Sequence, residues 1–312
     1  MMYLFKDFPL PQHHGGRVIT IGVFDGLHIG HQLLLSSLKE RAEALGAFAT
    51  VVTFNSHPDA LLYGASPLLL TTAEEKRDIL QSMAIDELLS LDFTAELAAI
   101  DAEEFIRGRL LPSKMCELIV GPDFALGKGR GGTLEVLGHL AADYAFGFHR
   151  VDHALWRDKP VSSTRIRKAL DRGDMPAVSA MLGRFYSASG VVVKGRMAGR
   201  GLGFPTANLS VASEKLLPAN GVYAGYAILD GERLPAVANI GFRPTFGSSE
   251  RSFEVHIIGF SGDIYGRKLS MYIAERLRDE EAFADPLLLQ RRISLDLEAA
   301  RTKLADIKIN EQ

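Results

Sequence analysis

The arrangement of apolar segments along the chain changes near residue 180. Before that point, short segments rich in β-branched residues alternate with segments of helical pattern. Strands that alternate with helices indicate an α/β fold with a parallel sheet. After that point, strand-like segments follow one another through Gly, Pro and Asp turns, which is typical of an antiparallel sheet or barrel. The change therefore predicts two domains of different architecture in one chain.

The expected elements follow from these patterns. In the first part, strands are expected at residues 17–24, 48–54, 87–91 and 116–120, and helices at 32–46, 95–111 and 164–172. Thr72 and Glu75 form a capping-box pattern that opens another helix, and Gly46 is placed to end the first one. In the second part, strands are expected at 190–194, 221–229, 234–240, 253–258 and 269–273, and a final helix at 287–307. We place the domains at 1–180 and 183–307, with the boundary near 178–185.

Charge and cysteine content exclude several classes of function. The 312 residues include 35 Lys and Arg and 38 Asp and Glu, for a formal net charge of −3, so no strong positive field marks a nucleic-acid binder. Cys116 is the single cysteine, which excludes an internal disulfide and a cysteine zinc cluster. The sequence has no secretory pattern and no apolar run near the roughly 20 residues of a membrane helix. We expect a cytoplasmic protein that binds neither nucleic acid nor membranes.

The strongest functional signal lies between the first expected strand and the first expected helix. There, His28 and His31 flank Gly30. In an open α/β sheet, ligands bind at the carboxyl ends of the strands, near helix N-termini. Imidazole and backbone N–H groups at such a place suit a phosphate whose negative charge grows in a transition state. The alternative interpretation is two solvated loop histidines without a function. The strand before them and the helix after them make this alternative weaker.

These residues carry a resemblance. The tetrapeptide 28–31 resembles the His-x-Gly-His signature of nucleotidylyltransferases, and the wider segment 20–31 is similar to the opening of bacterial bifunctional riboflavin kinase/FMN adenylyltransferases, the FAD synthetases. Nucleotidylyltransferases pass an adenylyl group from ATP to a phosphate acceptor and release pyrophosphate, without a covalent intermediate. The resemblance implies catalytic roles for His28 and His31. It also implies ATP contacts for Gly22, Phe24, Asp25 and Gly30.

A second basic motif lies at residues 161–167, Val-Ser-Ser-Thr-Arg-Ile-Arg. Its serines and threonine fit a helix start, which puts Arg165 in the first turn, the unfavourable end of the helix dipole for a cation. A cation placed there is expected to meet an anion, and arginine forks match phosphate oxygens. A solvated basic turn is the alternative. The motif resembles the Ser/Thr-x-Arg partner of His-x-Gly-His, which implies that Ser163, Thr164 and Arg165 hold the ATP β- and γ-phosphates.

Two loops of the first domain are similar to family segments that line the nucleotide and flavin pocket. The Gly-rich segment 121–132 is neither a dinucleotide-binding fingerprint nor a Walker A loop, because its strand ends too early and Lys128 precedes Gly129. It implies an ATP contact for Asp123, but Ala125 and Leu126 stand where the family usually has Arg and Phe. Segment 54–58 keeps the family's Phe, His and Pro. The flavin contacts implied by resemblance are Phe54, His57, Phe124 and Arg276.

A third motif, at residues 195–208, is the first candidate functional segment of the second domain. A Gly-rich basic loop after a strand can wrap phosphates with backbone N–H groups, and the oxygens of Thr206 and Asn208 suit Mg²⁺. A flexible turn is the alternative. The run 203–208, Gly-Phe-Pro-Thr-Ala-Asn, is similar to the riboflavin kinase module, as are segments 217–223, 239–245 and 253–256. The resemblance implies Mg-ATP binding by Gly195, Arg200, Gly203, Pro205, Thr206 and Asn208, with Thr206 and Asn208 as metal ligands.

Glu254 is the expected catalytic base of the second domain. It lies in mid-strand, between Phe253 and Val255, whose side chains must point the other way. A carboxylate on a strand that faces a cleft can take a proton from a primary hydroxyl. A solvent-facing carboxylate is the alternative, which the match to the family's catalytic Glu makes weaker.

The resemblance covers residues 17–307 and implies a whole activity. It implies a Rossmann-like nucleotidylyltransferase domain followed by a riboflavin kinase barrel. ATP would phosphorylate riboflavin to FMN in the second domain, and a second ATP would adenylylate FMN to FAD in the first, both with Mg²⁺. One alternative is an adenylyltransferase for another acceptor, such as phosphopantetheine or nicotinate mononucleotide. The other is a flavin-binding regulator with inactive sites.

Overall fold

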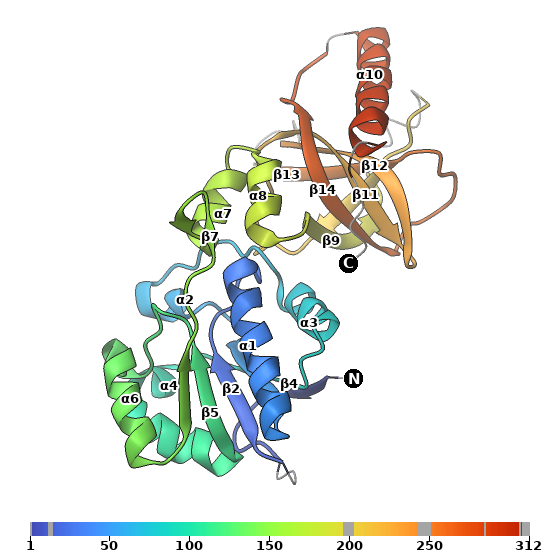
Figure 1. Cartoon of the computed structure of the whole chain (residues 1–312). Helices are drawn as coiled ribbons and strands as arrows, with labels where there is room; N and C mark the ends of the chain where they lie inside the picture. Colours follow the sequence, from blue (N-terminus) through green and yellow to red (C-terminus); the bar gives the residue numbers. More distant parts are fainter. Residues whose placement is uncertain are drawn as a thin grey trace. The chain divides into compact units, whose positions relative to one another are not determined.

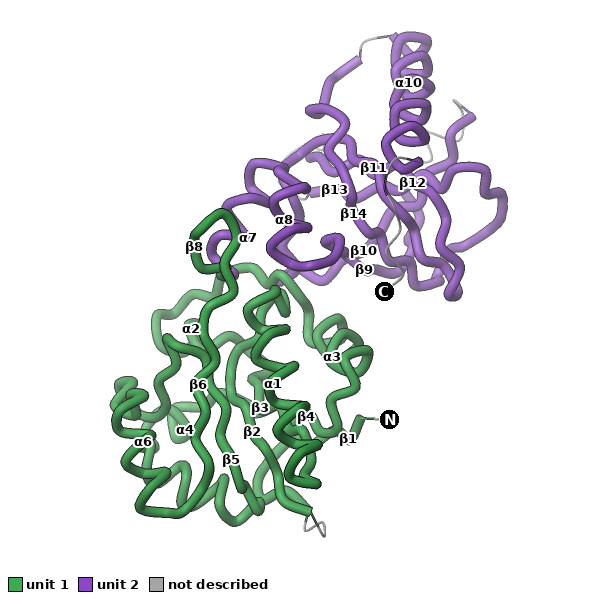
Figure 2. Tube along the Cα trace, in the orientation of Figure 1, with its two compact units in different colours: residues 1–162 green, residues 163–312 purple. Residues whose placement is uncertain are grey.

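The computed structural model describes residues 2–11, 15–195, 203–242, 251–283, 285–305 and 307. It divides into two compact units, Met1–Ser162 and Ser163–Gln312 (Figure 2). The division groups the segment 163–182 with the second unit. Where the two functional modules separate stays a prediction, with the sequence favouring a position near 180. Arg200 lies outside the described residues.

The first unit is built on a six-stranded sheet in the order β1-β4-β3-β2-β5-β6, in which every pair is parallel (Figure 1). Its strands are β1 (Tyr3–Phe5), β2 (Arg17–Ile21), β3 (Phe48–Phe54), β4 (Glu87–Leu91), β5 (Met115–Val120) and β6 (Gly147–Arg150). Its α-helices are α1 (Ile29–Leu45), α2 (Pro58–Tyr63), α3 (Ala73–Ser82), α4 (Ala95–Ala99), α5 (Ala102–Phe105) and α6 (Leu134–Asp143). The expected parallel α/β architecture is confirmed.

Helices cover both faces of this sheet. Strand residues alternate between the faces, so Val18 packs into a core with Leu35 and Leu38 of α1, whereas Ile19 packs on the other face into a core with Leu137 of α6. The chain runs from β2 outward to β3 and β4, then returns to the other side of β2 to form β5. The strand order therefore reverses between β2 and β5, which is where open α/β sheets bind ligands.

The single helix expected at residues 95–111 is wrong in detail. The segment forms α4 and α5, then a π-helical turn at Ile106–Leu110 and a 3₁₀ turn at Leu111–Ser113. Ile100 is extended, and the Asp101 side chain accepts a hydrogen bond from Glu104 N, which starts a new helix. The capping box at Thr72 and the left-handed Gly46 are confirmed.

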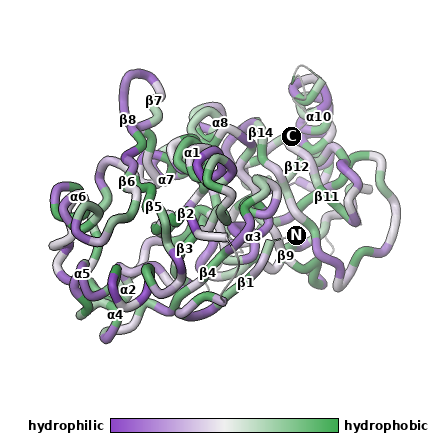
Figure 3. The backbone as a smooth tube through the Cα atoms, turned by 60° about the horizontal axis from the view of Figure 1, so that its bottom comes forward, coloured by the Kyte–Doolittle hydropathy of each residue, from purple (hydrophilic) through white to green (hydrophobic). Residues whose placement is uncertain are grey.

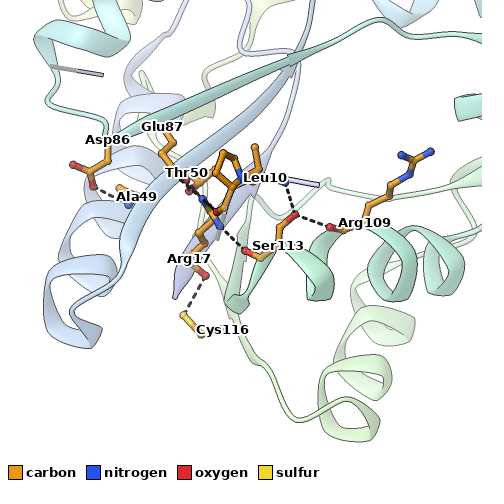
Figure 4. Close-up of polar contacts among 10 residues, drawn as sticks. Leu10, Arg17, Ala49, Thr50, Asp86, Glu87, Arg109, Ser113 and Cys116 are labelled. Carbon is orange, nitrogen blue, oxygen red and sulfur yellow. Dashed lines mark hydrogen bonds and ion pairs between the residues drawn. The ribbon is translucent and has the colours of Figure 1, made fainter. Parts of the chain in front are cut away.

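A buried ion pair ties the amino ends of the strands together (Figure 4). Arg17 and Glu87 have fully buried side chains, with 2.6 Å between Arg17 Nε and Glu87 Oε2. Glu87 Oε2 also accepts from Thr50 Oγ1 at 2.7 Å, and Arg17 Nη1 donates to Ser113 O at 2.8 Å. These contacts join β2, β3 and β4 at the edge of the sheet opposite the histidine turn.

The second unit is a closed antiparallel barrel in the order β10-β13-β12-β11-β14-β9, which pairing of β9 with β10 completes. Its strands are β9 (Tyr186–Val193), β10 (Ala207–Val211), β11 (Gly221–Leu229), β12 (Glu232–Phe242), β13 (Arg251–Ile257) and β14 (Lys268–Arg278). Its helices are α7 (Ser163–Leu170), α8 (Met175–Leu182) and α10 (Pro286–Ala305). The expected barrel and C-terminal helix are confirmed.

Helices cover parts of the outer face of this barrel. Ala300 and Leu304 of α10 pack with Val222, Ala224 and Tyr226 of β11, and α8 packs against β9 and β14. Within the described residues, no helix has the length and apolar character needed to cross a membrane.

The first unit ends in a small hairpin, formed by β7 (Leu155–Trp156) and β8 (Lys159–Pro160). Its tip is hydrophilic (Figure 3).

Candidate active sites

The histidine turn is held at the N-terminus of α1. His28 is the N-cap residue, and its Nδ1 accepts a hydrogen bond from His31 N at 3.3 Å. The two imidazole rings stack with 3.7 Å between centroids and 15° between planes, and Phe24 meets His31 edge-on at 5.2 Å. Because Nδ1 of His28 accepts, a neutral ring carries its proton on Nε2. The structure therefore presents an imidazole donor at the positive end of the α1 dipole.

Two glycines of the motif lie where a Cβ would crowd a neighbouring ring. A Cβ on Gly30 would lie 3.2 Å from Cε1 and Nδ1 of His28, and a Cβ on Gly22 would lie 3.1 Å from the Phe24 ring. The turn itself is left-handed at Phe24 (φ 50°), Gly26 (φ 84°) and Leu27 (φ 41°). Such φ values in residues other than glycine cost free energy, so the surroundings must hold this turn in place.

Asp25 holds the turn from inside. Its side chain is buried, and Oδ1 accepts from Leu70 N at 2.8 Å and Thr71 N at 3.1 Å. In return, Gly26 N donates to Thr71 Oγ1 at 3.0 Å. These bonds assign Asp25 a structural part in shaping the site, and its expected contact with ATP stays a prediction.

A small cavity lies at the carboxyl ends of β2 and β3. Phe54, His57 and Asp25 line it together with Lys76 of α3, a residue that the sequence reasoning missed. His57 Nδ1 accepts from Asp59 N at 3.2 Å and caps α2, and the Phe54 ring meets Phe93 edge-on at 5.3 Å. Burial lowers the pKa of the Lys76 ammonium to about 8, against a smaller raising effect of the Asp25 charge. The structure brings the two expected flavin residues of this segment together with a buried cation.

The Gly-rich loop after β5 is folded back on itself. Leu126 and Gly132 form a β-bridge, and Phe124 and Leu126 pack against the core on this face of the sheet. The Asp123 carboxylate is 86% exposed, and its Oδ2 lies 3.5 Å from Nε2 of His153, which follows β6. His153 is a second residue that the sequence reasoning missed, since nothing in its local sequence marks it. Asp123 and Phe124 stay predicted ligand contacts.

The basic motif begins a helix as expected. Ser163 is the first residue of α7, which puts Thr164 and Arg165 in its first turn, and Ile166 is fully buried. This helix belongs to the second compact unit. The phosphate contacts of Ser163, Thr164 and Arg165 stay predictions.

In the barrel, Glu254 lies on the outer face. Phe253 and Val255 are 2% and 1% exposed and point inward, so the expected alternation is confirmed. Thr206 Oγ1 donates to Glu254 Oε2 at 3.2 Å. Asn208 lies opposite Glu254 on β10, and Asn239 lies opposite it on β12, so the three form one cross-strand row. His256 Nδ1 lies 2.8 Å from Pro205 O, a contact that suits the structural role expected for this histidine.

Gly195 is placed against this row. A Cβ there would lie 2.1 Å from Nδ2 and 2.5 Å from Cγ of Asn208, so only glycine leaves room for the amide. Asn208 itself is buried. Gly203 has a left-handed φ of 85° and open space around it, so conformation rather than crowding favours glycine there.

A cavity of about 470 Å³ adjoins Thr206 at the mouth of the barrel. Pro205 and Thr206 line one side, and its remaining wall includes the apolar side chains of Val192, Val255, Ile257, Phe260, Ile264 and Tyr265. Ser261 and Asp263 also line it, so the cavity combines apolar walls with several polar groups, as small-molecule sites do.

Arg276 binds the loop that precedes β11. Its guanidinium donates to Asn220 O and pairs with Asp279 at 2.7 Å, and it fills the space that Gly173 and Gly221 leave. Arg251 binds the same loop, donating to Leu217 O at 3.1 Å. The expected flavin contact of Arg276 stays a prediction.

Among the residues that the structure describes, no three His, Cys, Asp or Glu side chains cluster as metal ligands do. The oxygens of Thr206, Asn208 and Glu254 are a different donor set, and hard oxygen ligands of this kind fit Mg²⁺ that keeps part of its water shell.

A His-x-Gly-His turn thus lies at the strand-order switch of an α/β sheet, and the Thr206–Glu254 pair lies on an antiparallel barrel. A family model described as FAD synthetase matches residues 10–165, and one described as riboflavin kinase matches residues 182–304. The chain belongs to the family of bifunctional riboflavin kinase/FMN adenylyltransferases.

Relatives span nearly the whole chain. The bifunctional riboflavin kinase/FMN adenylyltransferase of Pseudomonas fluorescens is 36% identical, with 95% of this chain and 96% of the relative covered. The protein of the same name from Bacillus subtilis is 32% identical over 93% of each chain. A solved structure from Streptococcus pneumoniae, described as a macrolide-efflux protein, aligns with a TM-score of 0.86 at 30% identity and covers 93% of this chain and 95% of its own.

Proposed function

We propose that the two family activities divide between the two sites described above. The chain is a bifunctional riboflavin kinase and FMN adenylyltransferase, with ATP as co-substrate of both steps. The observation that carries the division is the placement of motif residues: the stacked His28–His31 pair lies in the FAD synthetase region, and the Thr206–Glu254 contact lies in the riboflavin kinase region. The reducing environment of the cytoplasm, which suits a chain with one cysteine, is the proposed compartment.

In the kinase step, the riboflavin 5′-hydroxyl oxygen bonds to the γ-phosphorus of ATP, and ADP leaves. Glu254 takes the hydroxyl proton as this bond forms, and Thr206 Oγ1 orients the carboxylate by donating to Oε2. The cavity beside Thr206 offers an apolar wall for the adenine base. Mg²⁺ held by the oxygens of Thr206 and Asn208 would offset the phosphate charge.

In the adenylyl-transfer step, a phosphate oxygen of FMN bonds to the α-phosphorus of a second ATP. The bond from that phosphorus to the bridging oxygen of the β-phosphate breaks, and the products are FAD and pyrophosphate. His28 and His31 donate to the oxygens on which charge develops, and the N-terminus of α1 adds its dipole. Ser163, Thr164 and Arg165 are the proposed partners of the β- and γ-phosphates. The barrel motifs and the match to the riboflavin kinase family argue against another phosphate acceptor.

Chromatography of riboflavin incubated with Mg-ATP and the protein tests the whole proposal, with FMN and then FAD as the expected products. No turnover of ATP would favour a flavin-binding regulator. A screen of phosphopantetheine and nicotinate mononucleotide as acceptors tests the other alternative.

Two variants should separate the activities. Glu254→Gln keeps the shape but loses the basicity, so FMN formation should fall on the order of 10²-fold while added FMN still becomes FAD. His28→Asn keeps a good N-cap but loses the imidazole, so FAD formation should fall on the order of 10²- to 10³-fold while FMN formation survives. If either variant lost both activities equally, the two-site assignment would be wrong.

A further inference from the structure

One short segment, residues 70–76, holds the whole turn that precedes the histidines. Leu70 N and Thr71 N donate to Asp25, and Thr71 Oγ1 accepts from Gly26 N. At the other end of the segment, Lys76 Nζ donates to Val23 O at 2.7 Å. The turn is left-handed at Phe24 and Leu27, so it keeps its shape only because neighbours such as these hold it.

The Lys76 ammonium is an unusual choice for such a place. Its side chain is 8% exposed, and besides Val23 O it bonds to Thr53 Oγ1 at 3.1 Å. Thr53 Oγ1 itself donates to Val23 O at 3.2 Å, so that carbonyl keeps a hydrogen bond without the lysine. Hydrogen bonding in the fold therefore does not require a charge at this position.

The charge also costs folding free energy. Burial lowers the pKa of Lys76 from 10.5 to about 8. A base whose pKa is lower in the folded state destabilises that state while it is protonated, and stability rises with pH between the folded and the unfolded pKa. The free energy of unfolding therefore rises between about pH 8 and 10.5. At neutral pH, where Lys76 is protonated, its buried charge destabilises the folded state.

We propose that Lys76 is a positioning residue for adenylyl transfer, whose ammonium holds Val23 and balances Asp25 so that the turn presents His28 and His31 to anionic substrates. The balance matters because Asp25 is itself buried beside the turn. A buried carboxylate with no nearby cation would repel the phosphates of ATP and FMN. This inference rests on the proposed adenylyl-transfer site.

The titratable groups around the ammonium come from two other elements. Asp25 lies in the turn after β2, and His57 caps α2, and both line the same cavity as Lys76. Among the described residues, the only other one of α3 that lines this cavity is Ala73, which does not titrate. The Lys76 variants leave Asp25 and His57 in place, so a difference between their pH profiles and that of the wild type reports on Lys76.

The experiment compares the full-length wild type with Lys76→Met and Lys76→Arg, and with Arg77→Met as a matched control on the exposed face of the same helix. For each protein, the melting temperature at pH 7, the kcat and KM for FAD formation from FMN, and the rate of riboflavin phosphorylation are measured. Lys76→Met should melt no lower than the wild type, yet lose on the order of 10- to 100-fold in kcat for FAD formation, because a displacement near 1 Å is that costly. Riboflavin phosphorylation and the Arg77→Met control should stay unchanged.

The pH profile of FAD formation provides the second readout. Wild-type kcat should fall as pH rises through about 8, where Lys76 loses its proton. Lys76→Arg keeps its charge at every accessible pH, so it should move this alkaline limb upward. If the arginine variant fails to fold, Lys76→Met alone decides.

Unchanged kcat in Lys76→Met overturns the proposal, as does a parallel loss of melting temperature and of both activities, which would mark a purely structural lysine. A wild type that makes FMN but no FAD overturns the proposed adenylyl-transfer site instead.

Discussion

Replacing Gly195 by alanine should disable the kinase site without unfolding the barrel. The backbone at Gly195 has no left-handed φ, so alanine is conformationally allowed there. Its Cβ, however, would lie 2.1 Å from Asn208 Nδ2, whereas an ordinary contact begins at 3.4 Å. The amide must therefore move by more than about 1 Å, and buried Asn208 has little space in which to do so. A misplacement of this size costs about 10²-fold in rate, or about 2.7 kcal/mol in the barrier.

The assay measures kcat/KM for riboflavin phosphorylation and for FAD formation from FMN in the same preparation. Gly195→Ala should lower the first about 100-fold and leave the second unchanged. Gly138→Ala is the matched control, because this glycine has no heavy atom within 4 Å of an added Cβ and lies inside α6. It should keep both activities and gain up to about 1 kcal/mol in stability. Normal kinase activity in Gly195→Ala would refute the reasoning that Asn208 must stay where the structure places it.

Two further predictions concern stability. A chain that begins at residue 183 lacks α8, whose Met175, Val178, Met181 and Leu182 are buried, so it should lose about 5 kcal/mol or more and fold poorly, whereas one that begins at residue 163 should fold and make FMN. Equal melting temperatures for the two truncations would contradict this. Arg17→Met leaves Glu87 buried without its cation and should cost about 3–5 kcal/mol in urea denaturation, and the double variant with Glu87→Leu should recover much of that loss. A single variant as stable as wild type would show that the ion pair is dispensable.

Strong local patterns made much of the fold predictable. The strands expected at 48–54, 87–91 and 221–229 have the same bounds as β3, β4 and β11. These segments combine β-branched runs with flanking turn residues, so local preference and tertiary packing agree. Weak or mixed signals explain the misses. Strand β1 is three residues long, β10 begins inside the Gly-rich motif 195–208, and α8 directly follows α7 after a short turn.

The candidate sites divide in the same way. The residues that carry a motif, such as His28, His31, Thr206 and Glu254, were identified from spacing and resemblance, because their chemical type and neighbours in sequence mark them. Lys76 and His153 could not be identified from the sequence, because each reaches its site from a distant segment and has no local signature.

By itself, the sequence determined the two architectures, the order of the motifs and the chemistry they offer, since these depend on residue type and on spacing along the chain. Only the tertiary structure decided what each motif residue touches. It placed Asp25 on the backbone of Leu70 and Thr71, Asn208 in the space that Gly195 leaves, and the Lys76 ammonium on the Val23 carbonyl. Such contacts join segments far apart in the chain, and burial sets their energy, so no local pattern records them.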